Sequence, residues 1–103
     1  MGIRRRGTAL ARRVETGGRF VPSLARARVL GGSLAAKAVS GTLRDLANAT
    51  TLPSPRDYKI ALPPVRTAWC RRVTAQNLWL VYDLREDVVY ALMVLPSPPV
   101  PLD

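Results

Sequence analysis

Basic side chains are the candidate chemical groups of this sequence. Its 103 residues include 14 arginines and two lysines against seven acidic residues, a net charge of +9, and there is no histidine. A chain without histidine lacks the commonest general base and the commonest metal ligand. Arginine and lysine bind polyanions, so the composition favours nucleic acid or an acidic protein as the partner. We expect neither a metal nor an organic cofactor.

Cysteine chemistry is limited to one residue, Cys70. A single cysteine can form neither an internal disulfide nor a thiolate metal cluster. Without a histidine partner we interpret it as an inert small hydrophobe rather than a nucleophile. A chain without disulfides suits the reducing cytoplasm. No apolar run approaches the roughly 18 to 20 residues of a membrane span, so we expect a cytoplasmic protein with no membrane partner.

The basic charge is concentrated near the start of the chain. The first 30 residues hold eight arginines and one acidic residue, Glu15. Residues 1–13 show no stable hydrophobic period, and we interpret them as a flexible basic extension. An arginine-rich, acid-poor start is also typical of organelle transit peptides. The Gly17–Gly18 pair would break a long amphipathic helix, which favours the extension.

The first half of the chain predicts a short strand and then two helices. Residues 14–20 read as the strand, weakened by two glycines. Pro22 and Ser23 open a helical stretch that Gly31–Gly32 ends. Ser33 has the residue type of an N-cap, and a second helix follows it to about residue 48. One face of this helix carries the apolar residues Ala35, Val39, Leu43 and Leu46.

The second half predicts a small antiparallel sheet. After a proline-punctuated loop, strands are indicated at residues 57–62, 69–74, 78–84 and 88–95. The last two are apolar on both faces, as central strands are. The sequence therefore predicts an α+β domain over residues 14–95, in which two helices cover one sheet face and leave the other available. Residues 96–103 form a proline-rich tail that cannot continue a strand ladder.

Three stretches in this order resemble the RelE/ParE superfamily of toxins from bacterial type II toxin–antitoxin modules. FVPSL at residues 20–24 is similar to the start of that family's first helix. LRDLAN at residues 43–48, followed by the proline-rich loop and DYKI, resembles its second helix and next strand. Residues 69–92, from WCRRV through NLWLVYDLREDVVYAL, resemble its last three strands. The resemblance covers residues 14–95.

The resemblance implies a function. RelE-like toxins cut messenger RNA in the ribosomal decoding site, using basic and aromatic side chains on the sheet, and ParE-like toxins share the fold but poison DNA gyrase. Both are neutralised by an antitoxin. We therefore expect a ribosome-dependent mRNA interferase, an endoribonuclease that inhibits translation, arrests growth and binds a cognate antitoxin. The alternatives are a ParE-like gyrase inhibitor, a decayed toxin acting by binding only, or a basic RNA- or ribosome-associated structural protein.

Residue by residue, the resemblance gives Arg72 the catalytic position, where RelE-like toxins carry a lysine or arginine. Strand alternation places Arg72 on one face with Cys70, and Arg71 on the other, where it needs solvent or an acidic partner. The further candidates for contact with the substrate are Arg71, Lys59, Arg66, Arg56 and Trp79.

Two positions depart from the nuclease pattern. Trp79 stands where the family's hallmark strand has an arginine, and an indole can stack on a base but cannot grip a phosphate with two hydrogen bonds. After Val94 the chain continues as LPSPPVPLD, where family nucleases have a basic segment ending in histidine or tyrosine. These departures favour the alternatives in which the chain acts by binding.

Overall fold

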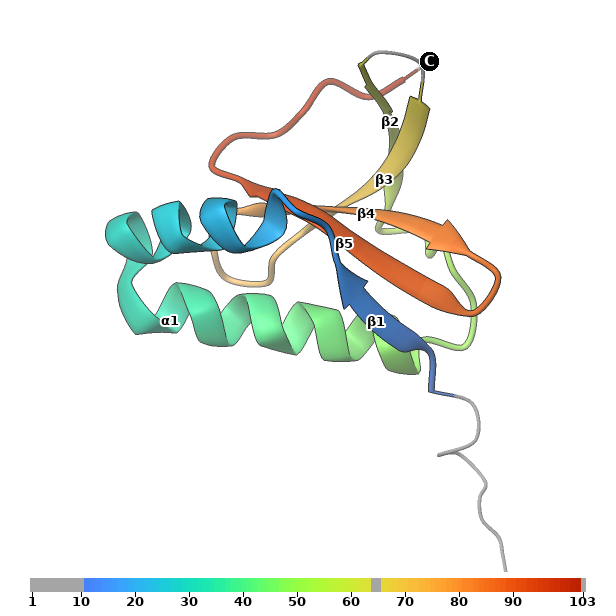
Figure 1. Ribbon diagram of the computed structural model, residues 1–103, viewed down its shortest axis with the longest axis horizontal. Helices are drawn as coiled ribbons and strands as arrows, with labels where there is room; N and C mark the ends of the chain where they lie inside the picture. The colour runs from blue at the N-terminus through green and yellow to red at the C-terminus, as the bar shows by residue number, and fades with distance from the viewer. Residues whose placement is uncertain (1–10, 64–65, 103) are drawn as a thin grey trace, which may run out of the picture.

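The computed structural model describes residues 11–63 and 66–102. Figure 1 shows one helical element below a twisted sheet of five strands. The prediction of an α+β fold is confirmed. The elements in chain order are β1 (Arg13–Thr16), α1 (Phe20–Asn48), β2 (Tyr58–Leu62), β3 (Arg66–Arg72), β4 (Trp79–Arg85) and β5 (Val88–Leu95).

The sheet has the strand order β1-β5-β4-β3-β2. Strands β2 to β5 form the predicted antiparallel meander, but β1 pairs parallel to β5, with Arg13 opposite Val88. The sheet is therefore mixed, which corrects the expectation of a wholly antiparallel one. Parallel pairing requires a crossover between the two strands, and the chain from α1 to β4 supplies it. Strand β3 also begins three residues earlier than predicted, because Arg66 pairs with Leu62 in a hairpin.

The prediction of two separate helices is not matched, because α1 runs as a single element from Phe20 to Asn48. Gly32 interrupts it with non-helical backbone (φ 70°, ψ −160°), a conformation open to glycine. At this residue α1 folds back on itself (Figure 1). A Cβ on the preceding Gly31 would lie 2.9 Å from the Cβ of Ala35, so the close approach at the bend also requires glycine. The glycine pair bends the helix rather than ending it.

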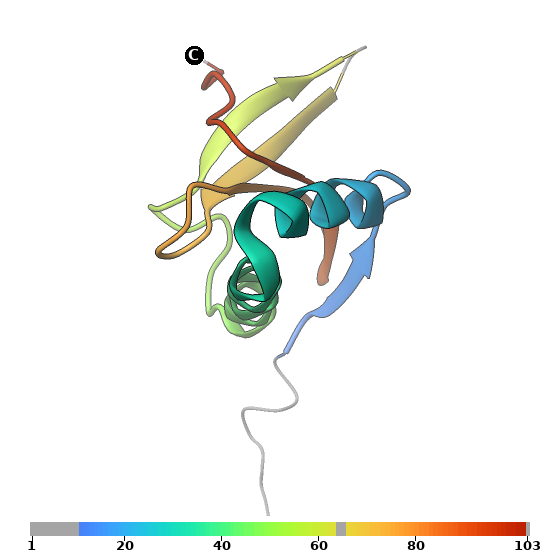
Figure 2. The same ribbon diagram turned by 90° about the vertical axis from the view of Figure 1, so that its left-hand side faces the viewer.

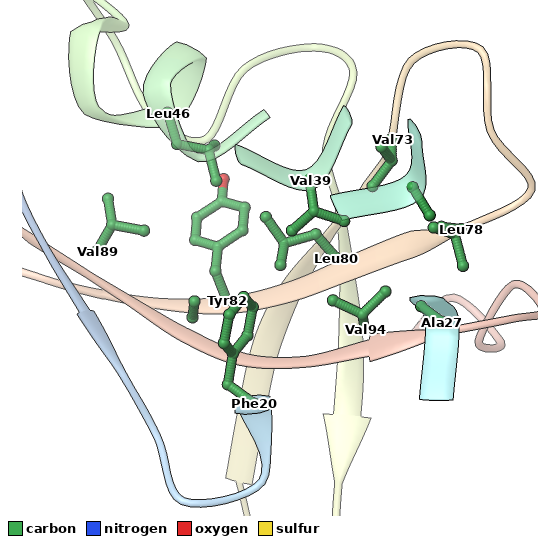
Figure 3. Packing of buried hydrophobic residues seen from close by; sticks show 12 residues of the cluster. Phe20, Ala27, Val39, Leu46, Val73, Leu78, Leu80, Tyr82, Val89 and Val94 are labelled. Carbon is green, nitrogen blue, oxygen red and sulfur yellow. The ribbon is translucent and has the colours of Figure 1, made fainter. Parts of the chain in front are cut away.

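The main core lies between α1 and the sheet. Tyr82, Leu80 and Val89 from the sheet are fully buried against Val39 and Leu46 of α1 (Figure 3). Alternate residues of the same strands point to the opposite side. There they form a second, smaller cluster whose buried members are Ile60, Ala68, Cys70 and Val81.

Both ends of the domain are tied to this framework. The backbone N–H of Arg12 donates to Ala47 O, and its guanidinium donates to the carbonyls of Ala49 and Thr50. A cation at the C-terminal end of a helix is favourable because the last carbonyls carry partial negative charge. The tail, residues 96–102, turns back and meets β2. Most of the predicted basic extension, residues 1–10, lies outside the described residues. No described helical stretch has the length and apolarity of a membrane span.

Ser23 joins α1 to the far end of β5, beyond the part that β1 covers. Its hydroxyl donates to Phe20 O at 2.8 Å and accepts the N–H of Val94 at 2.9 Å, and both bonds are buried. Strand β1 pairs with β5 only as far as Ala91, so β1 offers no acceptor for the N–H of Val94. The hydroxyl of Ser23 provides that acceptor.

Replacing Ser23 with alanine should lower the free energy of unfolding by about 1–3 kcal/mol, because the buried N–H of Val94 loses its acceptor. Urea denaturation measures the loss. The matched control is Ser40→Ala on an exposed position of α1, which should stay within about 0.5 kcal/mol of the unaltered chain. Equal stability of the two variants would contradict the role given to Ser23.

Candidate polyanion-binding face

The sheet surface turned away from α1 carries the predicted catalytic residue. We call it the second face, and its floor is the smaller cluster around Cys70 and Val81. Arg72 lies two residues after Cys70 in β3, so the two side chains point to the same face of the sheet. The side chain of Arg72 therefore lies on the second face and not beneath the helix. The residues of β3 and β4 that alternate onto the second face are Arg66, Ala68, Cys70, Arg72, Trp79, Val81, Asp83 and Arg85.

At one end of the second face Arg72 lies beside Trp79. The two are register partners in adjacent strands, and the guanidinium carbon lies 6.0 Å from the centre of the indole ring. Its Nε donates to Gln76 O and its Nη2 to Asn77 Oδ1, each at 3.3 Å. Within the described part of the chain Arg72 forms no ion pair, so neutral groups orient an exposed positive charge that is available to a phosphate.

At the other end of the face Asp83 lies between two arginines. Its Oδ2 accepts from Arg66 at 3.0 Å and from Arg85 at 3.1 Å. The Arg85 guanidinium also lies 5.7 Å from the centre of the Tyr90 ring. Because one carboxylate is shared by two cations, these three side chains together carry a net charge of +1.

Between the two charged ends the face is apolar. Cys70 and Val81 are fully buried there, and Tyr58 packs against them. Burial and the nearby Cys70 thiol raise the pKa of Tyr58 to about 12, and burial raises the pKa of Cys70 as well. Both groups are therefore protonated near neutral pH, and neither serves as a general base.

Arg71 lies on the opposite side of β3, in a buried pair with Asp57. Its Nε donates to Asp57 Oδ1 at 2.5 Å and its Nη2 to Oδ2 at 3.0 Å, while the side chains are only 5% and 0% exposed. The Tyr82 hydroxyl donates to the same Oδ2 at 2.6 Å, and Arg71 also donates to Ser54 Oγ at 2.7 Å. Arg71 thus has the acidic partner that its face required. Arg71 therefore does not lie on the second face.

Hydrogen bonding determines the charge state of Asp57. Burial alone would raise the pKa of its carboxyl, but the bonds from Arg71, Tyr82 and the backbone N–H of Ser54 outweigh burial and lower the pKa below its usual value. Burial and the bond to Asp57 raise the pKa of Tyr82, which keeps its hydroxyl a donor. The pair therefore stays ionised and fastens the loop before β2 to the middle of the sheet.

The remaining predicted contacts are spread around β2. Lys59 pairs with Trp69 in register, and its ammonium lies 5.7 Å from the centre of that ring, on the face opposite to Arg72. Arg56 is exposed in the loop before β2 and donates to Thr74 Oγ1 at 3.3 Å. Of the six predicted site residues, the structure brings Arg72, Trp79 and Arg66 onto one face.

A groove lies between the part of α1 that precedes the bend at Gly32 and the end of β5. The sequence patterns did not predict this groove. It encloses a cavity of about 580 Å³. Arg19 and Arg26 stand among its lining residues, and Leu30 is 76% exposed beside them. We call it the α1–β5 groove. The apolar members of its lining are Pro22, Ala27, Leu30, Leu78, Met93, Val94, Leu95 and Pro96.

Two solved structures share this fold. One is YafQ from E. coli strain BL21(DE3), 19% identical, aligned over 81% of this chain and 90% of that one with a TM-score of 0.60. The other is a chain of the chromosomal ParDE TA system from P. aeruginosa, 10% identical, aligned over 85% of this chain and 98% of that one with a TM-score of 0.59. No protein-family model matches the chain. No curated protein sequence matches it.

The chain therefore shares the fold of YafQ and of the chain from the ParDE system. The resemblance seen in the sequence is confirmed at the level of the fold.

The Asp57–Arg71 pair predicts a specific pH dependence of stability. The folded pKa of Asp57 lies below the unfolded value, so its stabilisation is present above the unfolded pKa and is lost as the pH falls through the folded pKa. Asp57→Asn should therefore cost about 3–5 kcal/mol at pH 7, because Arg71 is left buried without its counter-charge, and the cost should shrink in acid. Urea denaturation from pH 7 to pH 3 measures this.

The control for that experiment is Asp83→Asn, which removes a carboxylate from a partly exposed site that is bonded to two arginines. Its cost should stay near or below about 1 kcal/mol. A loss for Asp57→Asn that is the same at pH 3 and pH 7 would show that the carboxylate charge is not what stabilises the fold.

Proposed function

We propose that this protein is a toxin of a type II toxin–antitoxin module whose second face contacts a polyanionic target in the cytoplasm. One observation carries the proposal. Arg72 is exposed beside Trp79 on the sheet face away from α1, oriented by neutral groups and without an ion-pair partner in the described chain. The fold shared with YafQ and with the ParDE system supports the same class of protein.

The leading target is messenger RNA on the ribosome. Cleavage of RNA requires removal of the 2′-hydroxyl proton, stabilisation of the charge that develops on the phosphate, and protonation of the leaving oxygen. Arg72 is suited to the second task, and Trp79 to stacking on an unpaired base. The pKa values of Tyr58 and Cys70 are raised, so neither provides the base. We propose that the ribosome provides the positioning and any missing proton transfer.

A second candidate is binding without cleavage, as a ParE-like inhibitor of DNA gyrase. Trp79 at the position of the hallmark arginine favours it, since one of the expected phosphate contacts is then missing. The pairing of Arg66 and Arg85 with Asp83 also favours it, because those two arginines are already partly neutralised. In this case the chain would bind a protein or nucleoprotein surface, perform no chemistry and not require Arg72.

The partner that neutralises the toxin is proposed to dock in the α1–β5 groove. The floor of the groove is apolar, and Arg19 and Arg26 stand at it without an ion-pair partner among the described residues. A segment with one apolar face and one acidic face would bury Leu30 and compensate the two arginines. An acidic antitoxin segment has that chemistry.

Induced expression in bacteria tests the proposed function directly. The unaltered chain should arrest growth, and Arg72→Ala should relieve the arrest, because the exposed charge at the second face is lost. The matched control is Arg44→Ala, which removes an exposed arginine from α1 and should leave the arrest in place. Immunoblots must show equal soluble amounts of the three proteins. No arrest by the unaltered chain at confirmed soluble expression would refute the toxin proposal.

Two assays on the same proteins separate the two targets. Ribosome toeprinting should show new messenger RNA ends that depend on Arg72 if the chain is a nuclease. A supercoiling assay with purified gyrase should instead show inhibition if the chain is ParE-like, and Arg72→Ala should then change little.

The proposal of a basic RNA-associated structural protein makes an opposite prediction about the start of the chain. If residues 1–10 carry the nucleic-acid affinity, their deletion should remove most of it and flatten its dependence on salt, since the counterions displaced by their three arginines, about three, would no longer be released. The toxin proposal expects the deleted chain to arrest growth as before. Filter binding across salt concentrations, together with growth curves, decides between them.

A further inference from the structure

The tail, residues 96–102, runs back across the sheet. It leaves β5 at Leu95, the register partner of Trp79, and reaches β2 at the far edge of the sheet. There Pro101 forms an isolated antiparallel bridge with Ile60, and Leu102 N donates to Lys59 O at 2.7 Å. Figures 1 and 2 show the tail on the side of the sheet away from α1. Strand alternation in β3 places Arg72 on that same side.

The tail closes over the apolar middle of the second face. The Tyr58 hydroxyl donates to Pro99 O at 3.0 Å. Tyr58 and Ile60, which the tail contacts, belong to the cluster that also contains Cys70 and Trp79. A ligand that spread from Arg72 across this face towards β2 would therefore meet the tail.

Few contacts hold the tail against the sheet. The two apolar side chains of the tail, Val100 and Leu102, are 83% and 43% exposed, so they add little buried area. Pro96, Pro98, Pro99 and Pro101 have no N–H, so the tail cannot extend its single bridge into a ladder along β2. A proline-rich segment is also stiff, and it loses little conformational entropy when it closes. The tail therefore has one preferred closed position and few bonds that hold it there.

We propose that the tail is an intramolecular strap that closes over the second face and competes with the polyanion that binds there. The identity of the polyanion as RNA rests on the proposed function, but the closing of the strap does not. Binding of the ligand requires the open state, so the observed dissociation constant equals the intrinsic one divided by the open fraction. Removing the strap raises that fraction to one.

Affinity for RNA measures the competition. The probe is a fluorescein-labelled single-stranded RNA of about 12 nucleotides, and fluorescence anisotropy is recorded at one fixed salt concentration. A chain that ends at Leu95 should bind about ten-fold more tightly than the full chain if the strap is closed about nine-tenths of the time. Tyr58→Phe, which keeps the ring but loses the bond to Pro99 O, should give a smaller gain in the same direction.

Labelling of Cys70 gives a readout that does not depend on RNA. This thiol is the only one in the chain and lies fully buried in the cluster under Tyr58. A chromogenic aromatic disulfide exchanges with it and releases a coloured thiolate. Its rate should rise several-fold when the strap is removed, and should rise less in Tyr58→Phe, since access to the cluster requires the tail to move. Val100→Ala, at an exposed position of the tail, should leave both readouts unchanged.

The outcomes separate the strap from the proposed function. Faster labelling with tighter RNA binding supports both. Faster labelling when neither chain binds RNA supports the strap and removes RNA as the ligand. Equal labelling rates in the full and shortened chains, or equal RNA affinities where both bind, overturn the strap. Urea denaturation of the shortened chain measures how much of its Cys70 labelling comes from global unfolding. A labelling rate that global unfolding explains by itself also overturns the strap.

Discussion

The ion pair between Asp57 and Arg71 is the constraint on which the rest of the site depends. It is buried between β3 and the loop before β2, and two further hydroxyls, from Tyr82 and Ser54, complete its hydrogen bonding. Burying two charges is unfavourable unless they are paired and fully bonded, so β3 has one acceptable position relative to the loop before β2. A shift of β3 by one residue would leave a charge buried without its partner.

That register gives two adjacent arginines opposite roles. Arg71 faces α1 and is neutralised, while Arg72 faces away and keeps its charge. One arginine thus specifies structure, and the next one remains exposed. The same alternation brings Trp79 beside Arg72 and Arg66 beside Asp83. The distribution of charge on the second face therefore follows from the packing on the other side of the sheet.

Sequence patterns predicted the local features of this arrangement and missed the nonlocal ones. The limits of β2, β4 and β5 were correct to within a residue or so, because each strand carries its own alternation or apolar run. The sequence did not reveal that Asp57, 14 residues before Arg71, was its partner, since that pairing depends on how two strands and a loop meet. The parallel pairing of β1 and the α1–β5 groove were missed for the same reason. Both arise between segments far apart in the sequence, since β1 pairs with β5 and the groove lies between α1 and β5.

The place of β5 in the sheet has a consequence for how the protein is made. This strand is the last to be synthesised, yet it lies between β1 and β4, and Val94 bonds to a serine 71 residues earlier in the chain. The sheet cannot assemble while β5 is still inside the ribosomal exit tunnel, because an interior strand is then missing. Folding of the sheet is therefore deferred until β5 has left the exit tunnel, however early β1 and α1 are made.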